Sequence, residues 1–432
     1  MNSTTEKPPL VIVGSGGRAY REYSFAVLAR DYRLLAVLPA APTWQRGYLD
    51  GFAVADVGDP DAIAAAVSTL AGDEPEVGIL TWDETVLEAT AQVAEQLGLP
   101  HMSAQAAARC RDKYATRELM AAAGLPAVRF RLATTAEEAV VAAQELGFPV
   151  VVKPRALAGS MGVAVAPDEP AVREAFAAAD ASRYADLPTG HGVLVEEYLD
   201  GPEISVDSAV LDGVVRCVHV AHKRLGFPPG FEEVGHLVAE WSAQPWAAAV
   251  QELVVGAHHA LGVTHGVTHA EVRLTSAGPR LVELNGRLGG DLIPYLSELA
   301  TGIDLVAAAG KLAFGRAPRL IPIRHRTAEV RFVYPPYDCV VLDLDAGPAG
   351  STPGIAYAVA LAAPGDTMVL PPRSTVAVPR LAALVAVGQD EQECAEVLDR
   401  AEKALTVQLT PQPQVDQGLC AQHAEQTRQQ GP

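Results

Sequence analysis

Two alternating segments in the middle of the chain carry carboxylates at a spacing that suits a metal ion. Glu271 lies in the first segment, Glu283 and Asn285 lie in the second, and the stretch between them predicts a hairpin with Gly278 in the left-handed conformation. With a hairpin loop of odd length, Glu271 faces Glu283, and Asn285 shares that face because side chains repeat every second residue. Oxygen ligands of this kind suit Mg²⁺ that bridges phosphates. The alternative is a solvated strand edge with Arg273 as the counter-charge.

A lysine followed by a glycine-rich stretch could bind an anionic group. Lys153 ends an apolar run and precedes a loop that contains Gly159, Ser160, Met161 and Gly162. Small residues let backbone N–H groups approach phosphate oxygens, while the lysine provides a point charge for the same anion. A plain hairpin turn is the alternative for the loop taken alone. It is not a Walker-type P-loop, because the chain contains no Gly-x-x-x-x-Gly-Lys-[Ser/Thr] motif.

A third segment could hold a planar base. Glu196, Glu197, Tyr198 and Leu199 follow the apolar run 193–195. At such a strand end, backbone groups could hydrogen-bond to the edge of a base while aliphatic side chains cover its faces. The alternative is an ordinary strand.

Length and charge limit the kind of protein that carries these motifs. The chain has 432 residues, so several domains of roughly 100–200 residues are expected. Its formal net charge of -19 provides no global basic field for nucleic acid, and an anionic ligand must be held by a local cluster of cations. The apolar runs are shorter than the roughly 20 residues of a bilayer span. With no secretory signal at the N-terminus, we expect a cytoplasmic protein without nucleic-acid or membrane partners.

The elements that must position these residues are of two kinds, so the expected fold class is α/β and α+β multidomain. Apolar periodicity and Gly or Pro stops predict helices at 23–29, 85–97, 104–123, 135–146, 246–261 and 391–405. Short runs rich in β-branched residues predict strands at 10–13, 34–38, 77–81, 150–153, 163–166, 193–197, 214–221 and 327–333, and a hairpin within 270–284. The predicted units are an α/β domain with a mostly parallel sheet at 1–103, an α+β module at 104–318 (divided into 104–200 and 201–318), a C-terminal lobe at 319–408 and a disordered tail at 409–432.

The first glycine-rich turn has the form of a dinucleotide-binding fingerprint, with Gly14, Gly16 and Ala19 after a strand. Such a site needs a carboxylate for the ribose at the end of the second strand, where this chain has Val37, Leu38 and Pro39 instead. A tight turn between strand and helix is therefore the better interpretation.

Taken together and in order, the motifs resemble those of the ATP-grasp ligases. The resemblance extends from residue 10 to about 405. It depends on Lys113, on Lys153 with its glycine-rich loop, on 196–199, on Glu271, and on Glu283-x-Asn285-x-Arg287.

The resemblance implies an ATP-grasp fold behind an N-terminal Rossmann-like domain, with ATP between two α+β subdomains. Lys113 and Lys153 would bind the phosphates beneath the loop around Ser160, and Glu203 would reach the ribose. The segment 196–199 would line the adenine. The resemblance assigns magnesium, which manganese could replace, to Glu271, Glu283 and Asn285.

Within that superfamily, the chain is similar to the L-amino acid ligases that make dipeptides and to the biotin carboxylases. In the carboxylases the Asn-x-Arg-Leu segment continues with Gln-Val-Glu-His, whereas here Gly289, Gly290 and Asp291 follow Leu288. The departure removes the carboxylase signature and leaves Asp291 near the place of a catalytic glutamate, where it could orient or deprotonate an ammonium group. Arg287 is expected to hold an acylphosphate and its oxyanion.

The expected function is therefore ATP-dependent joining of an amino acid carboxylate to an amine through an acylphosphate. The alternatives are a carboxylating or purine-pathway ATP-grasp enzyme and, from another class, a nucleotide-binding sensor without turnover. A homodimer acting on small amino-acid-type molecules is expected. The candidate substrate-binding residues are Glu84, His236, His269, Gly289, Gly290 and Arg331.

Overall fold

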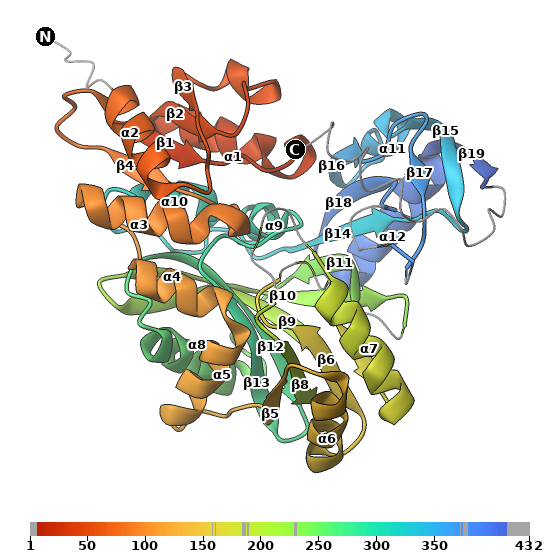
Figure 1. The fold of residues 1–432 in the computed structure, drawn as a ribbon. Coiled ribbons are helices and arrows are strands. Elements are labelled where there is room, and N and C mark those ends of the chain that lie inside the picture. The colour runs from red at the N-terminus through yellow and green to blue at the C-terminus, as the bar shows by residue number, and fades with distance from the viewer. Residues whose placement is uncertain are drawn as a thin grey trace, which may run out of the picture.

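The computed structural model describes residues 7–412 except 158, 160, 184–186, 188–189, 229–230, 372 and 375–378. The N-terminal domain is a parallel sheet of order β3-β2-β1-β4 that is covered on both faces. Helices α2 and α3 pack on one face, while α1 and the distant α10 pack on the other (Figure 1). Burial of both faces explains the continuous apolar runs of β1 and β2, and the α/β class with a parallel sheet that was predicted for this part of the chain is confirmed. The bounds are β1 Pro9–Val13, α1 Arg18–Asp31, β2 Arg33–Leu38, β3 Gly51–Val54, α2 Pro60–Ala71, β4 Gly78–Leu80, α3 Leu87–Leu97 and α10 Leu305–Leu312.

The predicted helix over 104–123 is two helices, α4 (Ala104–Arg111) and α5 (Lys113–Ala122). Asp112 separates them, because its side chain accepts hydrogen bonds from the backbone N–H groups of Tyr114 and Ala115. This cap satisfies donors that have no partner in the first turn of a helix. The break places Lys113 at the first position of α5.

A four-stranded antiparallel sheet of order β5-β8-β6-β7 carries the glycine-rich stretch. Helices α6 and α7 cover one of its faces. The sequence analysis did not predict α7, although Val172, Ala175, Phe176 and Ala179 are buried at helical spacing and Asp168 caps its N-terminus. The bounds are β5 Phe130–Ala133, α6 Ala136–Leu146, β6 Val150–Pro154, β7 Ala164–Ala166, α7 Glu169–Ala181 and β8 Val193–Glu197.

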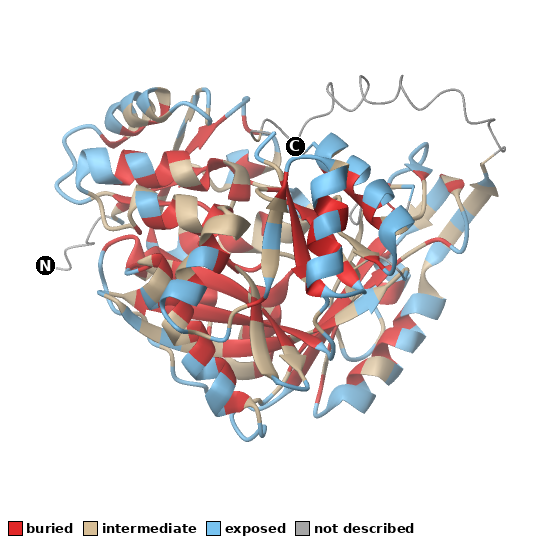
Figure 2. Ribbon diagram, turned by 60° about the horizontal axis from the view of Figure 1, so that its bottom comes forward, coloured by how far each residue is buried: buried red, intermediate tan, exposed pale blue. Residues whose placement is uncertain are grey.

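The largest sheet has eight antiparallel strands in the order β13-β12-β9-β10-β11-β14-β18-β16. At its β13 end, one face packs on α4, α5 and α8 through an apolar cluster. Toward the β16 end, α9 covers one face and α12 the other. Buried strands therefore run through the centre of the molecule (Figure 2). The bounds are β9 Glu203–Leu211, β10 Val214–Gly226, β11 Glu232–Val238, α8 Ala247–Leu261, β12 Gly266–Thr275, β13 Gly278–Asn285, α9 Ile293–Thr301, β14 Thr327–Val333, β16 Ile355–Ala360, β18 Ala382–Gly388 and α12 Glu391–Ala404.

The C-terminal segment is joined to the module before it, because β14 pairs with β11 and continues the large sheet. The boundary proposed at 318/319 stays a prediction, but it falls between two segments of one sheet. A small sheet of order β17-β15-β19 completes this part. The predicted disordered tail begins too early, since residues 409–411 belong to β19 and pair with β15. The bounds are β15 Cys339–Asp345, α11 Gly347–Gly350, β17 Thr367–Met368 and β19 Thr406–Pro411.

Among the described residues, none of the helices combines the length and the apolar character that crossing a bilayer requires.

The β11–β14 junction can be tested at Gly235. A β-carbon at this position would lie 2.5 Å from the carbonyl oxygen of Val330 on β14, and the backbone cannot give way without separating the strands. We expect Gly235→Ala to lower the free energy of unfolding by about 1–3 kcal/mol, measured by denaturant unfolding. Gly47→Ala is the control, since a β-carbon there meets no atom within 4 Å. Equal midpoints for Gly235→Ala and the wild type would show that the junction is not tightly packed.

Candidate functional site

A β-bulge brings the two predicted metal-binding carboxylates together. The loop of the β12–β13 hairpin has two residues, since Thr275 pairs with Gly278, so the prediction of an odd loop is wrong. A regular ladder would then place Val282 opposite Glu271. The register shifts by one residue between Glu271 and Val272, and Glu283 faces Glu271 as predicted. The bulged residue is Val282, which has no partner on β12.

Two lysines compensate the facing carboxylates. The ammonium of Lys113 lies 2.9 Å from Glu283, and that of Lys223 lies 2.9 Å from Glu271. Asn285 donates a hydrogen bond of 2.8 Å to Glu283, which confirms that the two share a face. Burial alone would raise the pKa of Glu283, but Lys113 and Asn285 hold it well below its usual range. Both carboxylates are therefore bound to cations.

Lys223 on β10 joins three carboxylates. Its ammonium lies 2.8 Å from Glu203, 2.8 Å from Glu233 and 2.9 Å from Glu271, and its side chain is 2% exposed. Burial alone would lower the pKa of this lysine, but the three carboxylates raise it well above its ordinary value. The sequence analysis missed Lys223. Lys223 lies two residues beyond the predicted strand 214–221, between His222 and Arg224, so no local pattern marked its burial.

The predicted phosphate-binding lysine lies against the predicted base-binding segment. Lys153 is buried, and its ammonium lies 2.7 Å from Glu196. Arg117 on α5 donates two further hydrogen bonds to the same carboxylate, at 2.9 and 3.2 Å. Burial alone would raise the pKa of Glu196, yet these cations lower it to about 2.

Arg287 connects the site to the N-terminal domain. Its Nε lies 2.5 Å from Glu84, whose other oxygen accepts from Arg111 at 3.1 Å. Arg111 also donates to the carbonyl oxygen of Ala156, just before the glycine-rich stretch. Both oxygens of Glu84 are therefore in ion pairs with arginines, and the substrate contact expected of Glu84 stays a prediction.

Asp291 is held by an arginine from the C-terminal segment. Arg380 donates to both carboxylate oxygens at 2.8 Å, and its guanidinium lies 3.6 Å from the centre of the Phe332 ring. Burial alone would raise the pKa of Asp291, but Arg380 and His236 hold it well below its usual range. Such a group can orient an ammonium, but it is a poor proton acceptor.

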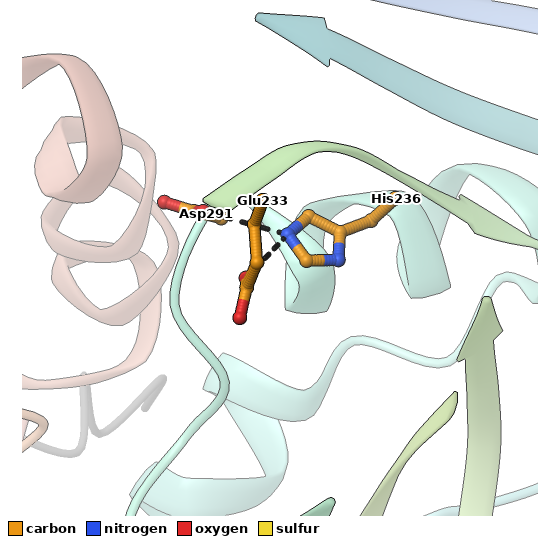
Figure 3. A group of neighbouring side chains, drawn as sticks. All are labelled: Glu233, His236 and Asp291. Carbon is orange, nitrogen blue, oxygen red and sulfur yellow. Dashed lines mark hydrogen bonds and ion pairs between the residues drawn. The ribbon is translucent and has the colours of Figure 1, made fainter. Parts of the chain in front are cut away.

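One ring nitrogen of His236, Nε2, faces the carboxylates of Glu233 and Asp291 (Figure 3). Its Nε2 is 3.1 Å from Glu233 and 3.4 Å from Asp291. These three residues could converge on a metal ion, but Lys223 and Arg380 already compensate both carboxylates. Burial alone would lower the pKa of His236, whereas the two carboxylates raise it. The two carboxylates are therefore already offset by neighbouring side chains, among which His236 contacts both through its Nε2.

His269 is paired with a buried aspartate that the sequence analysis missed. Its Nδ1 lies 2.5 Å from Asp207, and its Nε2 lies 3.6 Å from Glu271. Burial alone would lower the pKa of His269, but Asp207 and Glu271 raise it to about 9. A β-carbon on Gly289 would lie 2.9 Å from His269 and 3.0 Å from Asp207. The absence of a side chain at Gly289 therefore lets the chain cross over this pair.

Most of the predicted residues line one cavity of about 240 Å³. The cavity is also lined by residues that the sequence analysis did not select as site residues, including Arg117, Phe231, Glu233 and Arg273. The predicted residues that line it are Lys113, Lys153, Met161, Glu196, Glu197, Tyr198, Leu199, Glu203, His269, Glu271, Glu283, Arg287, Gly290 and Asp291.

Six of the predicted residues that the structure describes do not line this cavity. Glu84, His236, Asn285 and Gly289 lie behind it and contact residues that line it. Gly162 has a φ of +69°, and a β-carbon there would meet Pro154 and Ala179. The substrate role predicted for Arg331 is not supported, since its guanidinium lies 2.7 Å from Asp399 and 3.0 Å from Glu402 on α12. Ser160 lies outside the described residues.

Comparison with known proteins places this geometry in a family. An ATP-grasp domain model matches residues 146–295, and an ATP-grasp N-terminal domain model matches residues 38–101. The chain is 30% identical over 325 residues to phosphoribosylamine–glycine ligase of Streptomyces coelicolor, which covers 70% of this chain and 73% of that protein. The chain belongs to the ATP-grasp family.

Other ATP-grasp proteins are similar over comparable lengths. Alanine–anticapsin ligase of Bacillus subtilis is 25% identical over 336 residues, which covers 69% of this chain and 70% of that protein. The crystal structure of an L-amino acid ligase from Bacillus licheniformis superposes with a TM-score of 0.78 at 21% identity, over 95% of this chain and all of that one. The ATP-grasp fold predicted from the sequence is confirmed, together with the resemblance to L-amino acid ligases.

The residues present fit the ATP and magnesium that ATP-grasp enzymes use. Lys113 and Lys153 place two cations on the cavity wall, and Leu199 and Val151 supply an apolar surface beside them. Glu271 and Glu283 offer oxygen atoms of the kind that Mg²⁺ prefers. In the structure the ammonium groups of Lys223 and Lys113 lie against these oxygens. Magnesium would have to share them or displace Lys113.

The contribution of Lys223 and its three carboxylates to stability can be compared experimentally with that of an ordinary surface ion pair. We expect Lys223→Met to lower the free energy of unfolding by about 3–5 kcal/mol, because it leaves buried carboxylates without their cation. Arg224→Met is the control, since Arg224 is 39% exposed and pairs with Glu391 at the surface. It should cost no more than about 1 kcal/mol. Denaturant unfolding of both variants measures the difference, and similar losses would contradict the special role of Lys223.

Proposed function

We propose that this chain is an ATP-dependent carboxylate–amine ligase that joins two amino acids or closely related molecules. The observation that carries the proposal is the meeting of four kinds of group in one cavity. These are phosphate-binding cations (Lys113 and Lys153), paired metal-binding carboxylates (Glu271 and Glu283), an anion-binding arginine (Arg287) and a carboxylate whose pKa Arg380 and His236 hold below its usual range (Asp291).

In the first step, a carboxylate oxygen of the acid attacks the γ-phosphorus of ATP. The bond from that phosphorus to the β-phosphate oxygen breaks, and ADP leaves. Lys113 and Lys153 would bind the phosphate oxygens and offset their charge as it is redistributed. Glu271, Glu283 and Asn285 would hold magnesium, which would supply further positive charge against the phosphates.

In the second step, the nitrogen of the amine attacks the acyl carbon of the acylphosphate. The bond between that carbon and the phosphate oxygen breaks, and inorganic phosphate leaves with the electron pair. The guanidinium of Arg287, oriented by Glu84, would hold the oxyanion and the departing phosphate. The amine must lose a proton, and solvent is the simplest acceptor because Arg380 keeps Asp291 a weak base.

The polar end of the cavity supports amino acids as substrates. Glu233 and Asp291 line it, with Phe231 and Ile293 beside them. Each carboxylate can accept several hydrogen bonds, so Glu233 and Asp291 would still have oxygen lone pairs for the N–H groups of a substrate ammonium, beside Lys223, His236 and Arg380. His236 and Arg380, behind these carboxylates, would fix their orientation.

Arg287 provides the most direct test of this assignment. We expect Arg287→Ala to reduce the rate of amine-dependent ADP release by roughly 100- to 1000-fold, the loss seen when one oxyanion donor is removed. The assay is a screen of amino acids in pairs for ATP-dependent ADP release, with the product identified by mass spectrometry.

Arg331→Ala is the matched control, because Arg331 pairs with α12 outside the cavity. It should keep the wild-type rate. Undiminished turnover in Arg287→Ala would refute the catalytic assignment. ADP release that requires bicarbonate in place of the amine would instead favour a carboxylating ATP-grasp enzyme.

A further inference from the structure

Arg117 is buried and contacts both halves of the nucleotide site. Arg117 is 1% exposed, and it is the largest of the fully buried residues in the part of the chain that the structure describes. Its guanidinium donates to Glu196 on β8 and, at 2.7 Å, to the carbonyl oxygen of Val282 on β13. Strand β8 belongs to the four-stranded sheet and β13 to the eight-stranded sheet. One side chain therefore joins the two sheets between which the cavity lies.

The carbonyl that Arg117 holds belongs to the bulge. Val282 is the extra residue that shifts the register and sets Glu283 opposite Glu271. Leu281 and Leu284 face the apolar core, whereas the consecutive residues Val282 and Glu283 both line the cavity. A bulge disrupts its ladder locally, so its carbonyl needs another donor. Arg117 is that donor.

The carboxylate that Arg117 holds belongs to the phosphate-binding side. Glu196 accepts from Arg117 and lies 2.7 Å from the ammonium of Lys153. With Arg117 present, Glu196 is compensated by two cations, and Lys153 can turn to a phosphate without leaving a bare buried carboxylate. Leaving such a charge unpaired is costly.

We infer that Arg117 is a positioning residue, which couples nucleotide binding to metal binding by fixing the Val282 bulge and Glu196 at the same time. The inference rests on the proposed function, since it assigns a task within that site. A lysine at position 117 could keep the charge beside Glu196, but it lacks the planar fork that reaches both partners. The two tasks can therefore be separated by substitution.

The test uses the full-length protein and measures binding rather than turnover. Binding of a non-hydrolysable ATP analogue is followed by calorimetry at increasing free Mg²⁺ for the wild type, Arg117→Lys and Arg117→Met. In both variants we expect the Mg²⁺ concentration for half-maximal enhancement to rise roughly 10- to 100-fold, as when an outer partner of a metal ligand is lost. Without metal, Arg117→Lys should bind the analogue as the wild type does, and Arg117→Met should bind it more weakly.

Arg109→Met is the matched control, because Arg109 on α4 ties the chain to the carbonyl oxygen of Leu261 and does not reach the cavity. It should show the wild-type Mg²⁺ dependence. Circular dichroism and thermal unfolding show whether each variant is folded. If Arg117→Met does not fold, the test uses Arg117→Lys alone.

The outcomes separate the two claims. An unchanged Mg²⁺ dependence in folded Arg117→Lys would overturn the inference and leave the proposed function standing, since Arg117 would then be structural only. A wild type that binds no nucleotide at any Mg²⁺ concentration would overturn the proposed function and the inference with it.

Discussion

Carboxylates are gathered on one buried face of the large sheet, and each needs a cation within contact distance. Glu203, Glu233 and Glu271 share the ammonium of Lys223, and Glu283 has that of Lys113. A buried charge without a partner costs several kcal/mol, so the face can exist only as a set of compensated pairs. The opposite face of these strands is apolar and holds α4, α5 and α8. Strand alternation thus lets one sheet serve as both core and site.

This constraint explains why the site draws on the whole chain. Glu84 comes from the N-terminal domain, Arg117 from α5 and Arg380 from the C-terminal segment, and each pairs with a residue that lines or supports the cavity. Because these pairs join the sheets, the proposed reaction centre depends on how the domains meet. The C-terminal segment takes part by holding Asp291 and by extending the sheet through β14.

Local patterns in the sequence were enough to predict how the side chains of the candidate metal site are arranged. Alternation predicted that Glu271, Glu283 and Asn285 share a face, and the structure confirms it. The predicted loop length was wrong, because a two-residue turn and a bulge together give the pairing that an odd loop would give. Lys223, Arg117, Asp207 and Arg380 were missed for a different reason. Their partners lie on other elements, and no local periodicity states which strands become neighbours.

The central claim is that Glu271 and Glu283, brought together by the bulge, hold the divalent cation that the nucleotide phosphates share. Electron paramagnetic resonance of Mn²⁺ in the presence of a non-hydrolysable ATP analogue tests it directly. The account predicts metal binding that strengthens with nucleotide and weakens at least roughly 10-fold in Glu271→Gln and in Glu283→Gln, while each variant stays folded. Wild-type Mn²⁺ affinity in both variants would contradict it.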